Sequence, residues 1–155
     1  MKPALFLRIA SLLTLIHAAL HTVGGVFSKP SPGTATMVAA TMRSQFPFLG
    51  GMRSYADFYR GMGLAVSIFL VAEAIAFWLL ASLARKGSAS LRPLLAVFAL
   101  GYLSLALNSY AFFFLAPVIV ETLIATCLIA AIFTATSADE EPLPAERPIV
   151  DSARG

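Results

Sequence analysis

The amino-acid sequence predicts an all-α integral membrane protein, a four-helix bundle with a partly helical external loop between its first two spans. Three observations lead to this prediction. Hydrophobic residues make up 59% of the 155 residues and charged residues only 12%, whereas soluble domains carry about 25% charged residues. The mean hydropathy is +0.84. Four separate apolar stretches are long enough to cross a bilayer, which takes about 20 residues. This composition excludes a soluble enzyme, a disordered chain and a disulfide scaffold.

The bundle is predicted to occupy residues 1–136. Its four spans run approximately over residues 5–27, 58–82, 93–113 and 116–136. No charged residue separates the third span from the fourth. We place the bend between them at Leu115, Ala116 and Pro117, because proline is well tolerated at the start of a helix.

The segment between the first two spans, residues 28–57, is too long for a simple connection. Its stretch 34–46 predicts a short helix at the membrane interface, ended by Pro47, with nearby Phe and Met side chains dipping into the headgroups. Ser54 precedes Asp57 by three residues, and this spacing predicts a capping box that begins the second span. The last segment, residues 137–155, is acidic and contains proline, which predicts a disordered tail.

The distribution of Lys and Arg predicts the orientation. Four spans place both termini and the second connection on one side of the membrane, with Lys2, Arg8, Arg85, Lys86, Arg92, Arg147 and Arg154. The opposite side carries Lys29, Arg43, Arg53 and Arg60. The positive-inside rule then predicts a multi-pass protein with both termini in the cytoplasm. The basic residues form no continuous patch, so no nucleic-acid partner is expected.

Ionisable side chains at membrane depth are costly, at roughly 2.5–3.5 kcal/mol each, and usually face protein or water. The candidates for acid–base or catalytic roles are His17, His21, Glu73 and Glu121. His17 and His21 are four residues apart and share one helix face. A partner such as His17 would keep Glu73 charged, and both residues lie near the middle of their spans.

The candidates for ligand binding are Asn108, Tyr59, Arg53 and Asp57. Helical phase places Tyr59, Met62, Val66, Phe69 and Phe77 on the side of Glu73. The same reasoning places Gly101, Ser104 and Phe112 on the side of Asn108. The simplest bundle turns all these faces inward, which predicts a polar pocket in the outer half of the membrane, below the external loop.

Structural roles are the alternative for each of these residues. His17 and His21 would then form hydrogen bonds that fix the register of the helices, and Asn108 would join two helices. Glu121 would be hydrated near the interface. Asp57, with Arg53 and Arg60, would form ion pairs at the start of the second span, and such exposed pairs contribute at most about 1 kcal/mol.

Metal or haem binding through His17 and His21 is a further alternative. Histidines four residues apart on a helix suit a single metal ion, but the glutamate of the HExxH pattern is missing. Two histidines on one face of one helix also cannot bind opposite sides of one haem. The sequence therefore assigns no metal site, and it leaves the cofactor unknown.

Four motifs carry a family resemblance. They are Leu7-Arg8-Ile9-Ala10-Ser11, His17-x-x-x-His21-Thr22-x-Gly24, Phe46-Pro47-Phe48-x-Gly50 and Arg53-Ser54-x-x-Asp57-Phe58-Tyr59-x-Gly61-x-Gly63-Leu64. Together they resemble a family of small, uncharacterised bacterial membrane proteins with four predicted spans. The resemblance covers about residues 7–80. It implies a bacterial source and the four-span architecture, but no activity and no catalytic residues. A weaker likeness to emopamil-binding-type sterol isomerases and integral-membrane terpene cyclases is an analogy without a matching motif.

These observations leave several functions open. The first is an intramembrane pocket that binds a lipid-soluble small molecule or performs acid–base chemistry on it, because a carboxyl and an imidazole can move a proton. The second is a structural or accessory subunit, packed against another membrane protein or a second copy of the chain. The third is the metal or haem site. Transport is a fourth, and a single four-span bundle would need a dimer for it.

Overall fold

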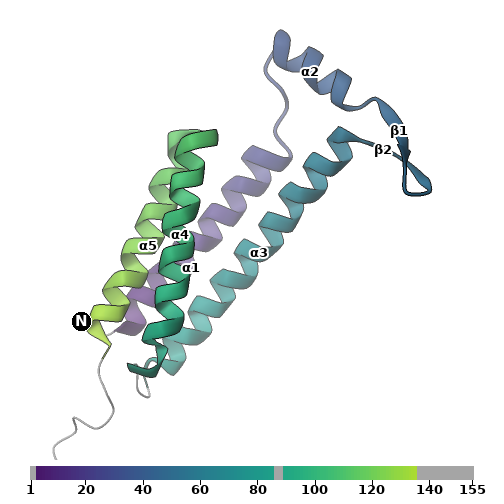
Figure 1. Ribbon diagram of the computed structural model, residues 1–155. Coiled ribbons are helices and arrows are strands. Elements are labelled where there is room, and N and C mark those ends of the chain that lie inside the picture. The colour runs from purple at the N-terminus through teal and green to yellow at the C-terminus, as the bar shows by residue number, and fades with distance from the viewer. Residues whose placement is uncertain (1–2, 86–88, 136–155) are drawn as a thin grey trace, which may run out of the picture.

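The computed structural model describes residues 3–85 and 89–135, and four long helices dominate it (Figure 1). Helix α1 (Pro3–Leu20) continues into a π-helical segment, η1 (His21–Val26). The other long helices are α3 (Tyr55–Leu83), α4 (Arg92–Phe112) and α5 (Leu115–Thr134), and a 3-10 turn, η2 (Ala89–Leu91), precedes α4. Between η1 and α3 lie a short helix, α2 (Thr34–Met42), and two strands, β1 (Gln45–Phe48) and β2 (Gly51–Ser54). The predicted tail 137–155 lies outside the described residues.

Each of the four long helices is long and apolar enough to cross a membrane. Their ends lie within three residues of the predicted spans. The prediction of a mostly helical protein with four candidate spans is therefore confirmed. Span boundaries are predictable because the length of an apolar run is a local property of the sequence.

The helices run alternately up and down, and α1 lies at the centre of the packing (Figure 1). It contacts α3 on one side and α5 on the other, and α5 also contacts α4. Large buried side chains fill the interior, and buried alanines lie between them: Leu7, Phe77, Leu95, Tyr102, Ile124 and Leu128, with Ala10, Ala81, Ala125 and Ala131. Small residues allow helix backbones to approach closely, and in lipid this packing is a main source of helix association.

We call the end of the bundle that carries α2 and the strands its outer end. Helices α3 and α4 meet near the opposite end, where the buried Phe77 ring lies 5.1 Å from the ring of Phe98. Toward the outer end α3 leans away from α4 (Figure 1). The predicted inward face of α3 is therefore only partly correct. Phe77 is buried, whereas four other residues predicted to lie on that face are exposed: Tyr59, Met62, Val66 and Phe69.

A capping box begins α3, as predicted. The Ser54 hydroxyl accepts a hydrogen bond from the Asp57 backbone N–H at 3.2 Å, and Asp57 Oδ2 accepts from the Ser54 backbone N–H at 2.9 Å. Each residue thus satisfies a backbone N–H that the first turn of a helix leaves without a partner. Because α3 directly follows β2, the cap also fixes where the hairpin joins the bundle.

The predicted interfacial helix over 34–46 is shorter than expected, because α2 ends at Met42 and an antiparallel hairpin follows it. Leu49 and Gly50 form the turn, with φ angles of +44° and +83°. Two-residue hairpin turns often need positive φ at both positions, and glycine adopts this conformation without strain. Pro47 lies within β1, opposite Met52, and does not end a helix. A two-stranded sheet consists of edge strands, which tolerate proline.

The bend between the last two helices also differs from the prediction. Helix α4 ends at Phe112 and α5 begins at Leu115, so the connection consists of Phe113 and Phe114. Pro117 lies in the first turn of α5. Proline fits there because the first N–H groups of a helix have no partner within it.

Candidate functional site

Side chains from three helices meet around Glu121 in the interior of the bundle. Glu121 lies on α5 and is only 4% exposed. Its Oε1 accepts a hydrogen bond of 3.1 Å from the Ser109 hydroxyl of α4. The same oxygen lies 4.0 Å from Nε2 of His17, which is buried on α1. This distance is too long for a hydrogen bond, but a small side-chain movement would bring the two groups into contact.

Two polar atoms of this group have no hydrogen-bond partner within the described part of the chain. They are Nδ1 of His17 and Oε2 of Glu121, and both are buried. A buried polar atom without a partner costs about 1–3 kcal/mol. Native proteins pair nearly all such atoms, so exceptions need a cause, such as a bound water, a ligand or a catalytic role.

A second set of polar side chains lies next to the first. The Tyr102 hydroxyl of α4 donates a 2.7 Å hydrogen bond to Oε2 of Glu73 on α3. It also lies 3.4 Å from the Thr14 hydroxyl of α1. Thr14 precedes His17 by three residues on α1, so the two sets occupy adjacent turns of that helix. We call these six residues from four helices the polar cluster: Thr14, His17, Glu73, Tyr102, Ser109 and Glu121.

The pairing within the polar cluster differs from the prediction. His17 was named as a partner that would keep Glu73 charged, but it lies beside Glu121, and Glu73 accepts a hydrogen bond from the Tyr102 hydroxyl. Helical phase and depth along a span place residues on a face at a given height. They do not determine which helix packs next to that face, and here α1 contacts both α3 and α5.

His21 makes its hydrogen bond outside the polar cluster, in a contact that we call the outer joint. This contact joins His21, Thr22 and Val26 of η1 to Gly63 and Ser67 of α3. The His21 Nε2 atom lies 3.1 Å from the Gly63 carbonyl oxygen, and because a carbonyl only accepts, Nε2 carries the proton. The hydroxyls of Thr22 and Ser67 lie 2.8 Å apart. This contact matches the alternative in which His21 forms a hydrogen bond between helices.

The expectation that the Asn108 face turns inward is wrong. Asn108 is exposed, and so are the residues predicted to share its face, Gly101, Ser104 and Phe112. The next residue, Ser109, points inward instead, on a face with four other buried residues: Leu95, Ala99, Tyr102 and Ala106. One residue corresponds to a rotation of about 100° on a helix. In α4, which is apolar on nearly every side, Asn108 alone did not identify the inner face.

Ser109, Tyr102 and Thr14 were not predicted as site residues. A signal for the first two was present in the sequence, since Leu95, Tyr102 and Ser109 are seven residues apart and repeat the same face of α4. Hydroxyl side chains are common in spanning helices, where they bond to their own backbone. Thr14 does so through the Ala10 carbonyl at 2.9 Å.

The other ligand-binding candidates lie at the outer end and do not join the polar cluster. Tyr59 and Arg53 are exposed, and the Arg53 guanidinium donates to the neighbouring Met52 carbonyl at 2.8 Å. The Asp57 carboxylate accepts hydrogen bonds from the backbone N–H and the hydroxyl of Ser54. A ligand-binding role for these three residues stays a prediction.

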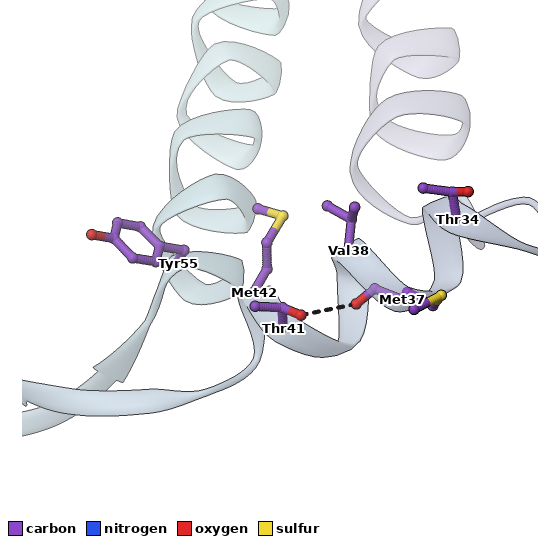
Figure 2. Close-up of a pocket in the computed structure, with 6 residues that line it drawn as sticks. All are labelled: Thr34, Met37, Val38, Thr41, Met42 and Tyr55. Carbon is purple, nitrogen blue, oxygen red and sulfur yellow. Dashed lines mark hydrogen bonds between the residues drawn. The ribbon is translucent and has the colours of Figure 1, made fainter.

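Two cavities also lie at the outer end. The first, of about 360 Å³, is a groove along α2 and the start of α3, lined by Thr34, Met37, Val38, Thr41, Met42 and Tyr55 (Figure 2). Figure 2 shows Val38 and Met42 pointing toward the ends of the two long helices beside α2. The second, of about 390 Å³, surrounds the hairpin turn. Residues of the polar cluster line neither cavity.

Within residues 3–85 and 89–135, no three His, Cys, Asp or Glu side chains lie close enough together to hold a metal ion. His17 and His21, the ligands in the metal or haem alternative, lie next to different groups, a carboxyl on α5 and a carbonyl on α3.

Comparisons with protein-family models, with curated proteins and with solved structures found no match to this chain.

Proposed function

We propose that this chain binds a lipid-soluble small molecule inside the membrane, at the polar cluster. The observation that carries the proposal is the pair of buried atoms without partners, Oε2 of Glu121 and Nδ1 of His17. A ligand with a polar group would supply the missing hydrogen bonds. Its remaining surface would be apolar, because the interior around the cluster consists of Leu, Ile, Ala and Phe side chains.

The route to this site leads from the bilayer between α3 and α4. The outer half of α3 leans away from α4, and Phe69 on that side is 70% exposed. Glu73 lies one turn of α3 after Phe69 and is half-buried. Access to the deeper residues requires α3 and α4 to part further, and motions of this kind occur on the microsecond-to-millisecond timescale.

Acid–base chemistry on the ligand is compatible with the same site. Imidazole and carboxyl groups are common general acids and bases, and His17 Nε2 lies 4.0 Å from the Glu121 carboxyl. The pair can exchange a proton once a substrate or a side-chain movement shortens this distance. The enzyme interpretation is a prediction that depends first on the binding of a ligand.

Ligand binding is testable by extraction of the purified protein. We expect full-length protein, isolated in a mild detergent, to retain a lipid-soluble molecule that mass spectrometry identifies after solvent extraction. Glu121→Gln keeps the size of the side chain and changes its hydrogen bonding. A hydrogen bond to a charged group contributes about 1.5–3 kcal/mol, so retention should fall roughly 10- to 100-fold.

Thr126→Ala is the matched control for this experiment, because Thr126 is an exposed polar residue on the same helix. It should retain the molecule as the unmodified protein does. Identical extracts from all three proteins would contradict the proposal. If Glu121→Gln lowered the melting temperature and left retention unchanged, the polar cluster would instead serve helix packing, as expected for a structural or accessory subunit.

We also propose a bacterial inner membrane as the location, with both termini in the cytoplasm. The excess of Lys and Arg at the termini and in the second connection supports the orientation. The resemblance of residues 7–80 to a bacterial family supports the location. Leu49 is 92% exposed at the hairpin turn, and Arg85 is exposed at the opposite end of α3. A membrane-impermeant maleimide should therefore label Leu49→Cys in intact cells and Arg85→Cys only after permeabilisation.

Cys127→Ala provides the background for both labelling variants, since Cys127 is the chain's one cysteine. Labelling of Arg85→Cys in intact cells, with Leu49→Cys protected, would show the reverse orientation.

A further inference from the structure

Away from the helix ends, the acidic residues of the long helices are Glu73 on α3 and Glu121 on α5. Within the described helices, Lys and Arg are found only near helix ends, at Arg8, Arg60 and Arg92. A ligand that complements the charge of this interior therefore carries a positive charge.

Glu73 is the carboxyl that a ligand from the bilayer reaches first. Its Oε2 accepts the Tyr102 hydroxyl, and the side chain is only half-buried. It lies on the stripe of α3 that is buried at Phe77 and exposed at Phe69. Lipid can cover exposed Phe or Met side chains without cost. A carboxyl facing hydrocarbon costs several kcal/mol and needs a polar or charged partner.

Aromatic residues neighbour this carboxyl: Tyr102 donates a hydrogen bond to it, and Phe77 lies one turn of α3 away. The Phe77 ring is 5.1 Å from the Phe98 ring and 6.1 Å from the Tyr102 ring, and Phe69 is one turn of α3 away from Glu73. Aromatic faces attract organic cations, and the attraction is stronger where water is excluded. Carboxyl groups and aromatic rings together are the chemistry that recognises a cation with apolar substituents.

Glu121 supplies a second carboxyl, which is more buried within the protein than that of Glu73. Its Oε2 is buried and has no partner among the described residues. Tyr102 and Thr14 connect the two regions, since the Tyr102 hydroxyl contacts both Glu73 and Thr14. Thr14 lies on the turn of α1 that precedes His17, the neighbour of Glu121.

From this arrangement we infer that the ligand of the polar cluster is a lipophilic organic cation, bound through Glu73 beside Tyr102, with Glu121 as the second, buried carboxyl. The inference rests on the proposed function and names its ligand class.

The test uses the full chain in nanodiscs of phosphatidylcholine, titrated with radiolabelled tetraphenylphosphonium as the cationic probe. We expect saturable binding that unlabelled tetraphenylphosphonium displaces and the neutral triphenylphosphine oxide does not. Glu73→Gln and Glu121→Gln should each weaken binding at least tenfold. Thr126→Ala should bind as the unmodified protein does.

Glu73→Asp keeps the charge and serves as the second variant if Glu73→Gln does not fold. It should retain the preference for the cation over the neutral probe. Equal displacement by the neutral probe, or unchanged binding by folded Glu73→Gln, would overturn the cationic ligand class. A complete absence of tetraphenylphosphonium binding would also overturn it. This holds as well if crosslinking shows that a second copy of the chain covers Glu73.

These failures are distinguishable from failure of the proposed function. A retained neutral molecule that is lost in Glu121→Gln would leave that function in place and refute only the cationic class. A protein that retains no molecule and binds neither probe would refute both.

Discussion

Phe77→Ala should lower the free energy of unfolding by about 3 kcal/mol or more. The Phe77 side chain is fully buried between α3 and α4 and packs edge-to-face on the Phe98 ring. Replacing a buried Phe with Ala typically costs 3–5 kcal/mol, because the site keeps a cavity. In a membrane the lost packing is the larger part of this cost, since lipid is as apolar as the protein core. Thermal unfolding in detergent measures the change.

Phe69→Ala is the matched control, because it makes the same change on the same helix. Phe69 is 70% exposed, so its removal leaves no cavity. We expect the free energy of unfolding of this variant to stay within about 0.5 kcal/mol of that of the unmodified protein. Equal destabilisation by the two variants would contradict the separation of α3 from α4 toward the outer end.

Gly63→Leu should break the outer joint and cost about 3 kcal/mol of stability. A Cβ atom at Gly63 would lie 2.8 Å from Cγ2 of Val26, which is closer than two carbon atoms can approach. Val26 is β-branched, and its side chain has little freedom to rotate away. The Gly63 carbonyl also accepts the His21 hydrogen bond, so moving η1 away from α3 breaks that contact as well. Overpacking alone typically costs 1–3 kcal/mol.

Gly61→Leu is the matched control on the same helix. A Cβ atom there has no neighbouring atom within 4 Å among the described residues. Leucine is also a better helix former than glycine, by up to about 1 kcal/mol. This variant should be as stable as the unmodified protein or slightly more stable. If Gly63→Leu unfolded at the same temperature as Gly61→Leu, the close approach of η1 and α3 would not contribute to stability.

The polar cluster shows which site residues could be predicted from the sequence and which could not. Ionisable residues are rare in spanning helices, so His17, Glu73 and Glu121 were identified by their position alone. Their partners Tyr102, Ser109 and Thr14 were not identified, because these residue types are common in such helices. The pairing of His17 with Glu121 depends on α5 lying next to α1.

Asn108 and the outer half of α3 show the limit of helical phase. Phase fixes which residues of a helix share a face, and it correctly grouped Glu73 with Phe77. In lipid, however, an apolar face turned outward costs as little as one turned inward. The sequence pattern therefore did not reveal that Asn108 points outward, or that α3 leans away from α4 toward the outer end.

The amino-acid sequence was enough to predict the four candidate spans, the capping box before α3 and the few ionisable residues within those spans. Each depends on local chemistry: the length of an apolar run, the spacing of two side chains, or the cost of a charge in hydrocarbon. The folded structure was needed to show which helix faces meet, which residue is the partner of each carboxyl, and that a hairpin follows α2. These outcomes depend on how side chains from separate helices fit together, and the sequence of one helix does not contain that information.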